Sequence, residues 1–245
     1  MRCWVIVLGL CCLARAQENA FEVFHDANLA FDNGEYDNAI ARYQDLIAQG
    51  FQSAGVYFNL ANAYFKGAHV GLAIFHYRKA LELAPRDEEA RANLAFARER
   101  VVDRVEGGQS LGYRLQTVAN SVSEKEACYS LIVFVVALFL GSALRLYYRK
   151  EWLQWVCNAM AVASVLGGVL VFYHALLRPE YGVVVAPEAK VYSGLGKDNV
   201  VLFALHEGVE FVVEESVGSE WVRLRLMDGK RGWVNTPLIV TSTIS

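Results

Sequence analysis

The hydrophobic positions of this chain follow three patterns in succession. Between residues 20 and 105, apolar side chains recur every three or four positions, which predicts amphipathic helices. Two long apolar stretches follow, at 127–144 and 152–177, and each is long enough to cross about 30 Å of bilayer hydrocarbon as a helix. From residue 183 onward, short apolar runs alternate with turn residues, which predicts strands. We therefore predict a multidomain chain with an all-α part, a two-helix membrane hairpin and a small all-β part.

The helical part repeats itself along the sequence. A shift of 34 residues brings Ala39 onto Ala73 and Tyr43 onto Tyr77, and this is the period of the tetratricopeptide helix–turn–helix unit. Two units are fewer than the three usually needed to bury a core, so a further helix should cover the open end. We predict a repeat domain at 17–106, consisting of two units and a capping helix: 20–53, 54–87 and Asp87–Val105.

Tetratricopeptide arrays bind extended peptides in a concave groove lined by the first helix of each unit. The register places these side chains on that face: Phe24, Asn28, Phe31, Phe58, Asn59, Asn62 and Phe65. Asparagine suits a peptide backbone because its amide both donates and accepts hydrogen bonds. The phenylalanines are equally explained as packing between helices, whereas the asparagines are less easily explained as core.

The two apolar stretches are too closely linked to form anything but a hairpin. We place its helices at 127–148 and 152–177, with a turn at 149–151. Arg145, Arg149 and Lys150 at this turn predict that it lies in the cytoplasm. Residues 1–16, with the A-x-A site Ala14-Arg15-Ala16, predict an export signal. Both signals place the flanking soluble regions outside the cytoplasm.

The segment at 107–126 connects the repeats to the hairpin. Leu111, Leu115, Val118 and Val122 recur at helical spacing. This pattern fits an amphipathic helix on the membrane surface, and it fits a connector packed on the repeats equally well.

Composition excludes several classes of function. Apolar residues make up 55% of the chain and the net charge is only −3, which suits a membrane protein and does not suggest nucleic acid. Cys128 and Cys157 fall in the apolar stretches, so the exported regions have no thiol chemistry. The histidines have no metal-ligand spacing, and His69 and His76 should lie at the surface. Without a hydrolase motif or a phosphate loop, we expect no enzymatic activity, no metal and no cofactor.

The C-terminal region, 178–245, reads as short strands in a small barrel. We predict strands at 183–186, 200–205, 209–213, 221–226 and 232–234, with Asp228-Gly229 as a turn. The stretch Trp221–Val234 resembles the closing hairpin of bacterial SH3-type domains, and His206-Glu207-Gly208 matches another fixed point of that family. The resemblance implies a peptide-binding or glycan-binding surface formed by Tyr192, Trp221 and Trp233, with one of the two tryptophans in the core.

The order of the segments resembles the BatE family of bacterial aerotolerance operons. The most specific stretches are Val56–Tyr64, Ala73–Pro85 and Leu205–Gly208. The resemblance implies an inner-membrane protein in a stress-tolerance complex with von Willebrand factor A-domain membrane proteins and, through them, a MoxR-type AAA+ ATPase. On this basis we expect a non-enzymatic adaptor that binds partner proteins outside the cytoplasm. The alternatives are a peptidoglycan-binding envelope protein and, less well supported, a membrane-bound hydrolase.

Overall fold

The computed structural model describes residues 19–103, 115–116 and 118–242. The chain forms two compact units: residues 1–108 together with 180–245, and residues 109–179. The expected export signal at 1–16 lies outside the described residues, as does much of the expected linker helix. We describe each unit separately.

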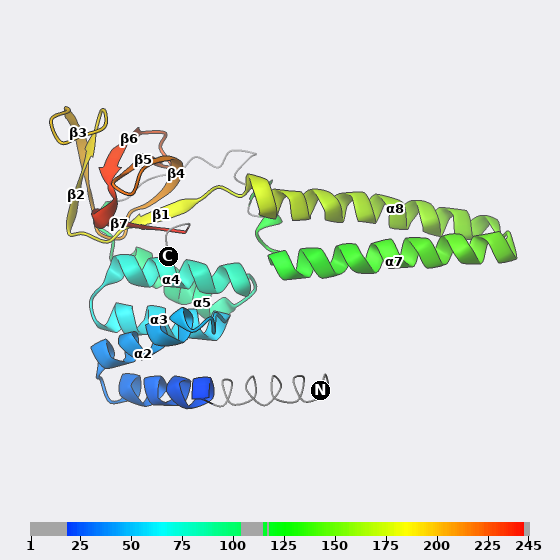
Figure 1. Ribbon diagram of the computed structural model, residues 1–245, viewed down its shortest axis with the longest axis horizontal. Coiled ribbons are helices and arrows are strands. Elements are labelled where there is room, and N and C mark those ends of the chain that lie inside the picture. Colours follow the sequence, from blue (N-terminus) through cyan, green and yellow to red (C-terminus); the bar gives the residue numbers. More distant parts are fainter. Residues whose placement is uncertain (1–18, 104–114, 117, 243–245) are drawn as a thin grey trace, which may run out of the picture. The chain divides into compact units, whose positions relative to one another are not determined.

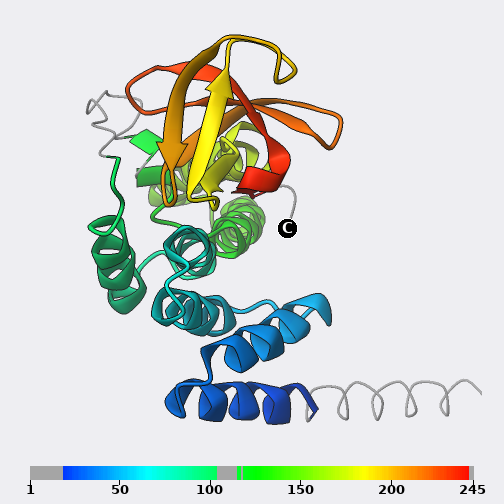
Figure 2. The same ribbon diagram turned by 90° about the vertical axis from the view of Figure 1, so that its left-hand side faces the viewer.

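The first unit begins with stacked helices (Figure 2). Residues 19–32 are helical, and four further helices follow: α2 (Tyr36–Ala48), α3 (Ala54–Lys66), α4 (Val70–Leu83) and α5 (Glu88–Arg98). Ser53 caps α3 by accepting a hydrogen bond from the Val56 amide at 3.3 Å, and Asp87 caps α5 in the same way. Helices 19–32 and α2 form one pair, α3 and α4 form a second, and α5 covers the end of the second. We call residues 19–103 the repeat domain.

The capping helix is shorter than expected. It ends at Arg98 instead of continuing to Val105, so that part of the prediction was wrong. Val101 lies beyond the helix, where it packs against the buried cluster of the repeats and also against that of the C-terminal sheet. Its apolar side chain therefore belongs to the contact between two domains and not to the apolar face of α5.

The C-terminal part of the first unit is a seven-stranded antiparallel sheet with strand order β3-β2-β6-β5-β4-β1-β7 (Figure 1). Its strands are β1 (Tyr181–Val184), β2 (Glu188–Tyr192), β3 (Val201–His206), β4 (Glu210–Val217), β5 (Trp221–Arg225), β6 (Arg231–Asn235) and β7 (Ile239–Thr241). Gly229 has a φ of 89° in the turn between β5 and β6, as expected. Strands β2 and β7 were not expected. We call residues 180–242 the sheet domain.

Neither Trp221 nor Trp233 belongs to the core of the sheet domain, although one of them was expected there. Val222 is paired with Val234 in the β5–β6 register, and both are buried, as is Leu224. Trp221 and Trp233 occupy the alternate positions of their strands and are only half-buried. The expectation that one of them fills the core was therefore wrong, because the strand alternation assigns that role to smaller β-branched residues and leucine.

The two domains of the first unit share a hydrophobic core. Tyr181 and Val183 of β1 belong to the same buried cluster as Leu60 and Ile74 of the repeats. The ring centroids of Tyr181 and Phe75 are 5.9 Å apart. The regions before and after the hairpin thus fold into one compact unit.

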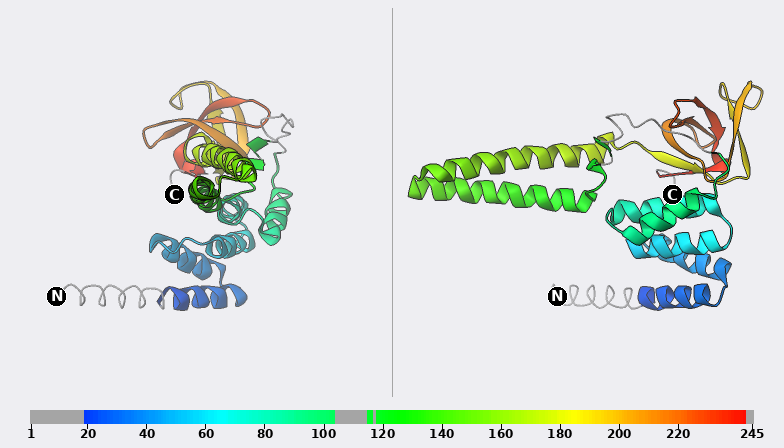
Figure 3. Two further views of the ribbon diagram at one scale, coloured as in Figure 1. Left: turned by 90° about the vertical axis from the view of Figure 1, so that its right-hand side faces the viewer. Right: turned by 180° about the vertical axis from the view of Figure 1, so that it is seen from behind.

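The second unit is a helical hairpin formed by α7 (Glu124–Tyr148) and α8 (Glu151–Phe172), with a π-helical turn at Tyr173–Leu177. The two helices run side by side along their length (Figure 3). Ser123 and Glu126 form a capping box at the start of α7, and Arg149 reverses the chain in a left-handed conformation with φ 45°. Both helices are long and apolar enough to cross a membrane.

Candidate functional site

The asparagines expected on the first helices form a repeated hydrogen-bond ladder. The Tyr43 hydroxyl donates to Asn28 Oδ1 at 2.6 Å, and Asn59 Nδ2 donates to the same oxygen at 3.0 Å. In the next unit, the Tyr77 hydroxyl donates to Asn62 Oδ1 at 2.5 Å, and Asn93 Nδ2 donates to the same oxygen at 3.1 Å. Every residue of the first set lies 34 positions before its counterpart in the second. We call these six residues the Tyr–Asn ladder.

The ladder leaves half of each amide available. Among the described residues, Asn28 Nδ2 and Asn62 Nδ2 donate no hydrogen bond, and Asn59 Oδ1 and Asn93 Oδ1 accept none. All four asparagines are only partly buried. The ladder therefore presents two donors and two acceptors in a fixed, alternating arrangement, which suits an extended peptide backbone.

The tyrosines of the ladder are held in their donating form. Burial, partly offset by the neighbouring asparagine, raises the pKa of Tyr43 and of Tyr77 to about 12. Their hydroxyls therefore keep their protons at any physiological pH. Because these hydroxyls always donate to Oδ1 of Asn28 and of Asn62, they hold that oxygen inward and leave the Nδ2 group of the same amide facing outward.

The phenylalanines of the same helices pack against the repeat core. Phe24 meets Tyr43 edge-on at 6.0 Å between ring centroids, and Phe58 lies 6.0 Å from Tyr77. Phe31 meets Tyr36 at 5.6 Å, and Phe65 lies 5.5 Å from Phe96. All four expected phenylalanines are partly buried. Phe96, which was not expected on this face, is 48% exposed and carries the Arg100 guanidinium 5.3 Å from its ring centroid.

The three aromatic residues expected on the sheet-domain surface lie close together. Tyr192 meets Trp221 edge-on at 5.8 Å between ring centroids, and it is paired with Trp233 where β2 meets β6. All three are half-buried. At the neighbouring edge of the sheet, four apolar side chains that were not expected there are exposed: Val201 and Leu202 in strand β3, and Leu195 and Val200 in the segment before it.

His76 is enclosed within the repeats. Its ring stacks against Tyr64 at 5.3 Å and Tyr57 at 6.0 Å, and its Nδ1 is buried without a hydrogen-bond partner among the described residues. Burial, helped by the charge of Lys79, lowers the pKa of His76 to about 3. The expected surface position was therefore wrong for His76, because its enclosing rings come from α3. Within the described residues, no group of His, Cys, Asp and Glu has the geometry of a metal site.

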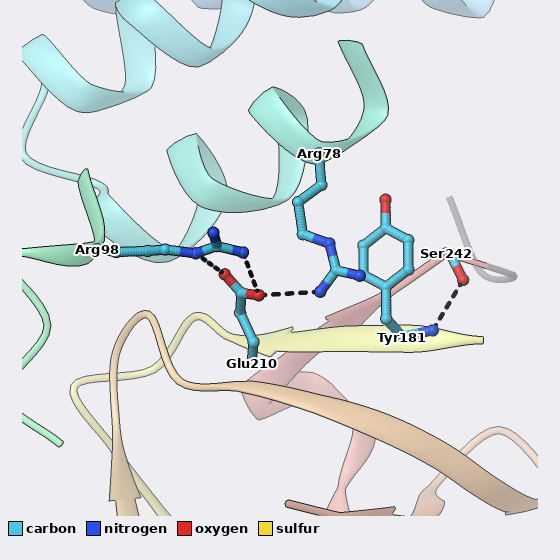
Figure 4. Close-up of polar contacts among 5 residues, drawn as sticks. All are labelled: Arg78, Arg98, Tyr181, Glu210 and Ser242. Carbon is cyan, nitrogen blue, oxygen red and sulfur yellow. Dashed lines mark hydrogen bonds and ion pairs between the residues drawn. The ribbon is translucent and has the colours of Figure 1, made fainter. Parts of the chain in front are cut away.

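The contact between the repeat and sheet domains contains a charged network that the sequence did not reveal (Figure 4). Arg98 of α5 binds both carboxylate oxygens of Glu210 on β4, at 2.8 and 2.9 Å. Arg78 of α4 donates to Glu210 Oε2 at 3.0 Å and lies 3.6 Å from the ring centroid of Tyr181. We call this contact the junction.

Glu210 is ionised in the junction. Burial by itself would raise the pKa of its carboxyl, but the hydrogen bonds and charges of Arg98 and Arg78 outweigh burial and lower it. The side chain is only 16% exposed. Because two cations share one carboxylate, the loss of Glu210 would leave both without this partner in a partly desolvated contact.

The segment His206-Glu207-Gly208 also belongs to the junction. The His206 amide donates to Asp103 Oδ2 at 2.8 Å, and the amide of Gly71 at the start of α4 donates to Glu207 Oε1 at 2.9 Å. Glu207 thereby caps a helix whose own N-cap residue, His69, provides no side-chain hydrogen bond. This segment was matched in the sequence to a fixed point of bacterial SH3-type domains, and in the structure it contacts the repeats.

Comparison with known families supports the helical repeat. Residues 54–87 match the family model of the tetratricopeptide repeat. This range coincides with the second unit predicted from the 34-residue period, and it contains α3 and α4. A search of curated proteins gave no match. Repeats of this family imply protein partners in general terms.

Proposed function

We propose that this protein is a non-enzymatic adaptor that holds a partner protein on the Tyr–Asn ladder while the hairpin anchors it in a membrane. The observation that carries the proposal is the ladder itself. It recurs with the repeat period, and on both units it leaves amide donors and acceptors of partly buried asparagines without a partner among the described residues. A purely structural hydrogen-bond pair has no need for such unused groups on alternate helices, here the first helix, α3 and α5.

The partner we propose is a von Willebrand factor A-domain membrane protein of a Bat-type aerotolerance complex, which would link the adaptor indirectly to a MoxR-type AAA+ ATPase. The support for this choice is the BatE-like order of segments. The basic hairpin turn supports an inner-membrane orientation in which both soluble domains lie outside the cytoplasm. The sheet domain, which we assign as SH3-like, would then provide a second contact.

The test is affinity purification of the full chain from detergent-solubilised bacterial membranes. The Asn62→Ala change alone would leave the buried hydroxyl of Tyr77 without its acceptor, so we combine it with Tyr77→Phe. We expect the Asn62→Ala/Tyr77→Phe variant to recover about tenfold less partner, because the lost peptide hydrogen bonds contribute about 1 kcal/mol each. Identification of von Willebrand-type proteins in the wild-type eluate would support the choice of partner.

The Tyr77→Phe single variant is the matched control. It removes the hydroxyl that orients the Asn62 amide but keeps the amide itself, so partner recovery should fall much less than in the double variant. Equal recovery by the double variant and the control, with helix content unchanged by circular dichroism, would rule out the ladder as the binding site.

Peptidoglycan binding is the second candidate function. It is favoured by the half-exposed cluster of Tyr192, Trp221 and Trp233, because flat aromatic surfaces suit sugar rings. Sedimentation of the full chain with purified cell walls separates the two proposals. The cell-wall function predicts that Trp221→Ala releases the chain from the pellet, whereas the adaptor function predicts no sedimentation above that of a membrane protein without this domain.

A further inference from the structure

The turn of the hairpin contains a cleft of about 780 Å³ that lies between α7 and α8. Arg145 from the end of α7, Arg149 and Lys150 from the turn, and Gln154 and Asn158 from α8 line it. The cleft lies entirely within the second unit, so its geometry does not depend on the soluble domains.

The cleft has an excess of positive charge. Three cations face a single carboxylate, Glu151, and none of these cations forms an ion pair with a described residue. The start of α8 adds to this field. Its N-cap residue, Lys150, supplies no side-chain hydrogen bond, so the backbone N–H groups of Glu151 and Trp152 have no side-chain cap, whereas the Leu153 N–H donates to the Lys150 carbonyl at 3.2 Å. A helix start with uncapped N–H groups beside unpaired cations favours an anion such as a phosphate group.

Neutral polar groups continue the site into the hairpin. Gln154 Nε2 donates to Asn158 Oδ1 at 2.9 Å, one turn further along α8. This bond leaves the Gln154 oxygen and the Asn158 amide nitrogen available to a hydroxyl or an ester carbonyl. These groups lie between the charged turn and the apolar middle of the helices, which is the order of groups along a phospholipid from phosphate to acyl chain.

Aromatic residues place the cleft at the level of the lipid headgroups. Trp155 lines the cleft and is 75% exposed, and Trp152 is 62% exposed on the same turn of α8. Tyr147 and Tyr148 are exposed at the end of α7. Tryptophan and tyrosine concentrate at membrane–water interfaces. In an inserted hairpin, the cleft therefore lies at the level of the lipid headgroups of one leaflet.

We propose that the hairpin cleft binds the phosphate group of an anionic phospholipid. Arg145, Arg149 and Lys150 contact the phosphate, the start of α8 donates backbone N–H groups to it, and the Gln154–Asn158 pair contacts the glycerol region. This inference rests on the proposed membrane insertion of the hairpin. It adds a specific lipid partner to what would otherwise be a plain anchor.

Native mass spectrometry of the full chain in detergent micelles tests the site. We expect phosphatidylglycerol to bind at least tenfold more tightly than phosphatidylcholine with the same acyl chains. The Arg145→Gln/Arg149→Gln/Lys150→Gln variant should lose about a hundredfold in phosphatidylglycerol affinity, because each basic residue near an anionic surface contributes about a fivefold factor. Binding in micelles does not depend on orientation, so an inverted topology cannot produce this loss.

Two further variants and competition by inorganic phosphate distinguish a specific lipid-binding site from general electrostatic attraction. Lys125→Gln removes a cation at the opposite end of α7 and should leave lipid affinity unchanged. Arg145→Lys/Arg149→Lys keeps the charge but loses the bidentate guanidinium contacts, so it should bind several-fold less tightly than the wild type. Equal binding of the two lipids, an equal loss with Lys125→Gln, or displacement of the lipid by millimolar inorganic phosphate would each overturn the proposal.

Membrane insertion is measured separately. Carbonate extraction of cell membranes reports whether the hairpin is inserted, whatever lipid it binds. Release of the wild-type chain by carbonate would contradict the anchor, whereas retention together with equal lipid affinities would contradict only the lipid site.

Discussion

Tyr43 and Tyr77 determine how the neighbouring asparagines face solvent. A neutral amide can present either its oxygen or its nitrogen, and the two orientations differ little in shape. A tyrosine hydroxyl that donates to Oδ1 fixes the oxygen inward and the Nδ2 group outward. A ligand then meets donors that are already oriented, so binding costs less conformational entropy. This preorganisation is what distinguishes the ladder from an ordinary polar patch.

The enclosed ring of His76 makes the stability of the repeats dependent on pH. The folded pKa of about 3 lies below the ordinary value of 6.5, so between these pH values the unfolded chain binds a proton that the folded chain does not. Stability therefore falls as the pH drops below 6.5. We expect this residue to cost about 2 kcal/mol at pH 5 relative to pH 8.

Chemical denaturation of the full chain in detergent at these two pH values measures the effect. His76→Phe keeps a flat ring between Tyr57 and Tyr64 but cannot be protonated, so it should remove about 2 kcal/mol of the pH dependence. His25→Gln, on the exposed side of the first helix, is the control for the loss of a histidine as such. An unchanged difference between pH 8 and pH 5 in His76→Phe would show that the ring opens to solvent.

At the scale of the elements, the start of α4 meets the sheet domain at a glycine. A Cβ atom on Gly71 would lie 2.4 Å from the carbonyl oxygen of Val184, closer than real Cβ atoms come. The Gly71 amide also donates to Glu207 at this point. The close approach of helix and strand therefore requires a residue without a side chain.

We predict that Gly71→Ala loosens the junction and destabilises the first unit by about 1–3 kcal/mol, because backbone must move to admit the methyl group. Amide hydrogen exchange should rise in α4 and β1. Gly55 is the matched control, since it is likewise the second residue of its helix, α3, and has open space around it. Gly55→Ala should be neutral or stabilising by up to about 1 kcal/mol. Equal effects of the two changes would show that the junction tolerates a side chain.

The helical elements could be predicted because their signals are local. The 34-residue period, Ser53 and Asp87 as caps and Pro85 as a terminator all act within a few residues of the helix that they define. Strand β2 escaped prediction because Glu188 and Lys190 occupy its exposed face, and β7 has only three residues. Short or charged strands depend on their partners in the sheet for identification, and a single sequence does not reveal those partners.

At the scale of the molecule, the hairpin interrupts a unit that is continuous in space. The contacts of the junction join residues 103 to 163 positions apart, on either side of α7 and α8. Sequence periodicity predicts elements but carries no signal for such distant pairs, which is why Arg78, Arg98 and Glu210 were not anticipated. The Asn28, Asn59 and Asn62 positions were predictable because the repeat register itself determines their face.

Glu210 couples the sheet domain to the repeat domain through its contacts with two arginines. We predict that Glu210→Gln, which keeps the volume but removes the charge, destabilises the junction by about 1–3 kcal/mol, because it leaves Arg78 and the half-exposed Arg98 without their shared anion. Since the folded pKa of Glu210 is lowered, its contribution is complete above about pH 4.5 and is lost as the pH falls through the folded pKa. The wild-type chain should therefore approach the variant in strongly acidic buffer.

The location of this effect can be tested against a neighbour on the same strand. Glu214 pairs with Arg225 and Arg231 inside the sheet domain and forms no ion pair with the described residues of the repeats, so Glu214→Gln should raise hydrogen exchange in β5 and β6 only. Glu210→Gln should raise it in α4, α5 and β1, on both sides of the junction. If exchange in α4 stayed at the wild-type rate in Glu210→Gln, the shared apolar core of Phe75, Tyr181 and Val183 would be sufficient to hold the domains together, and the charged network would have a different role.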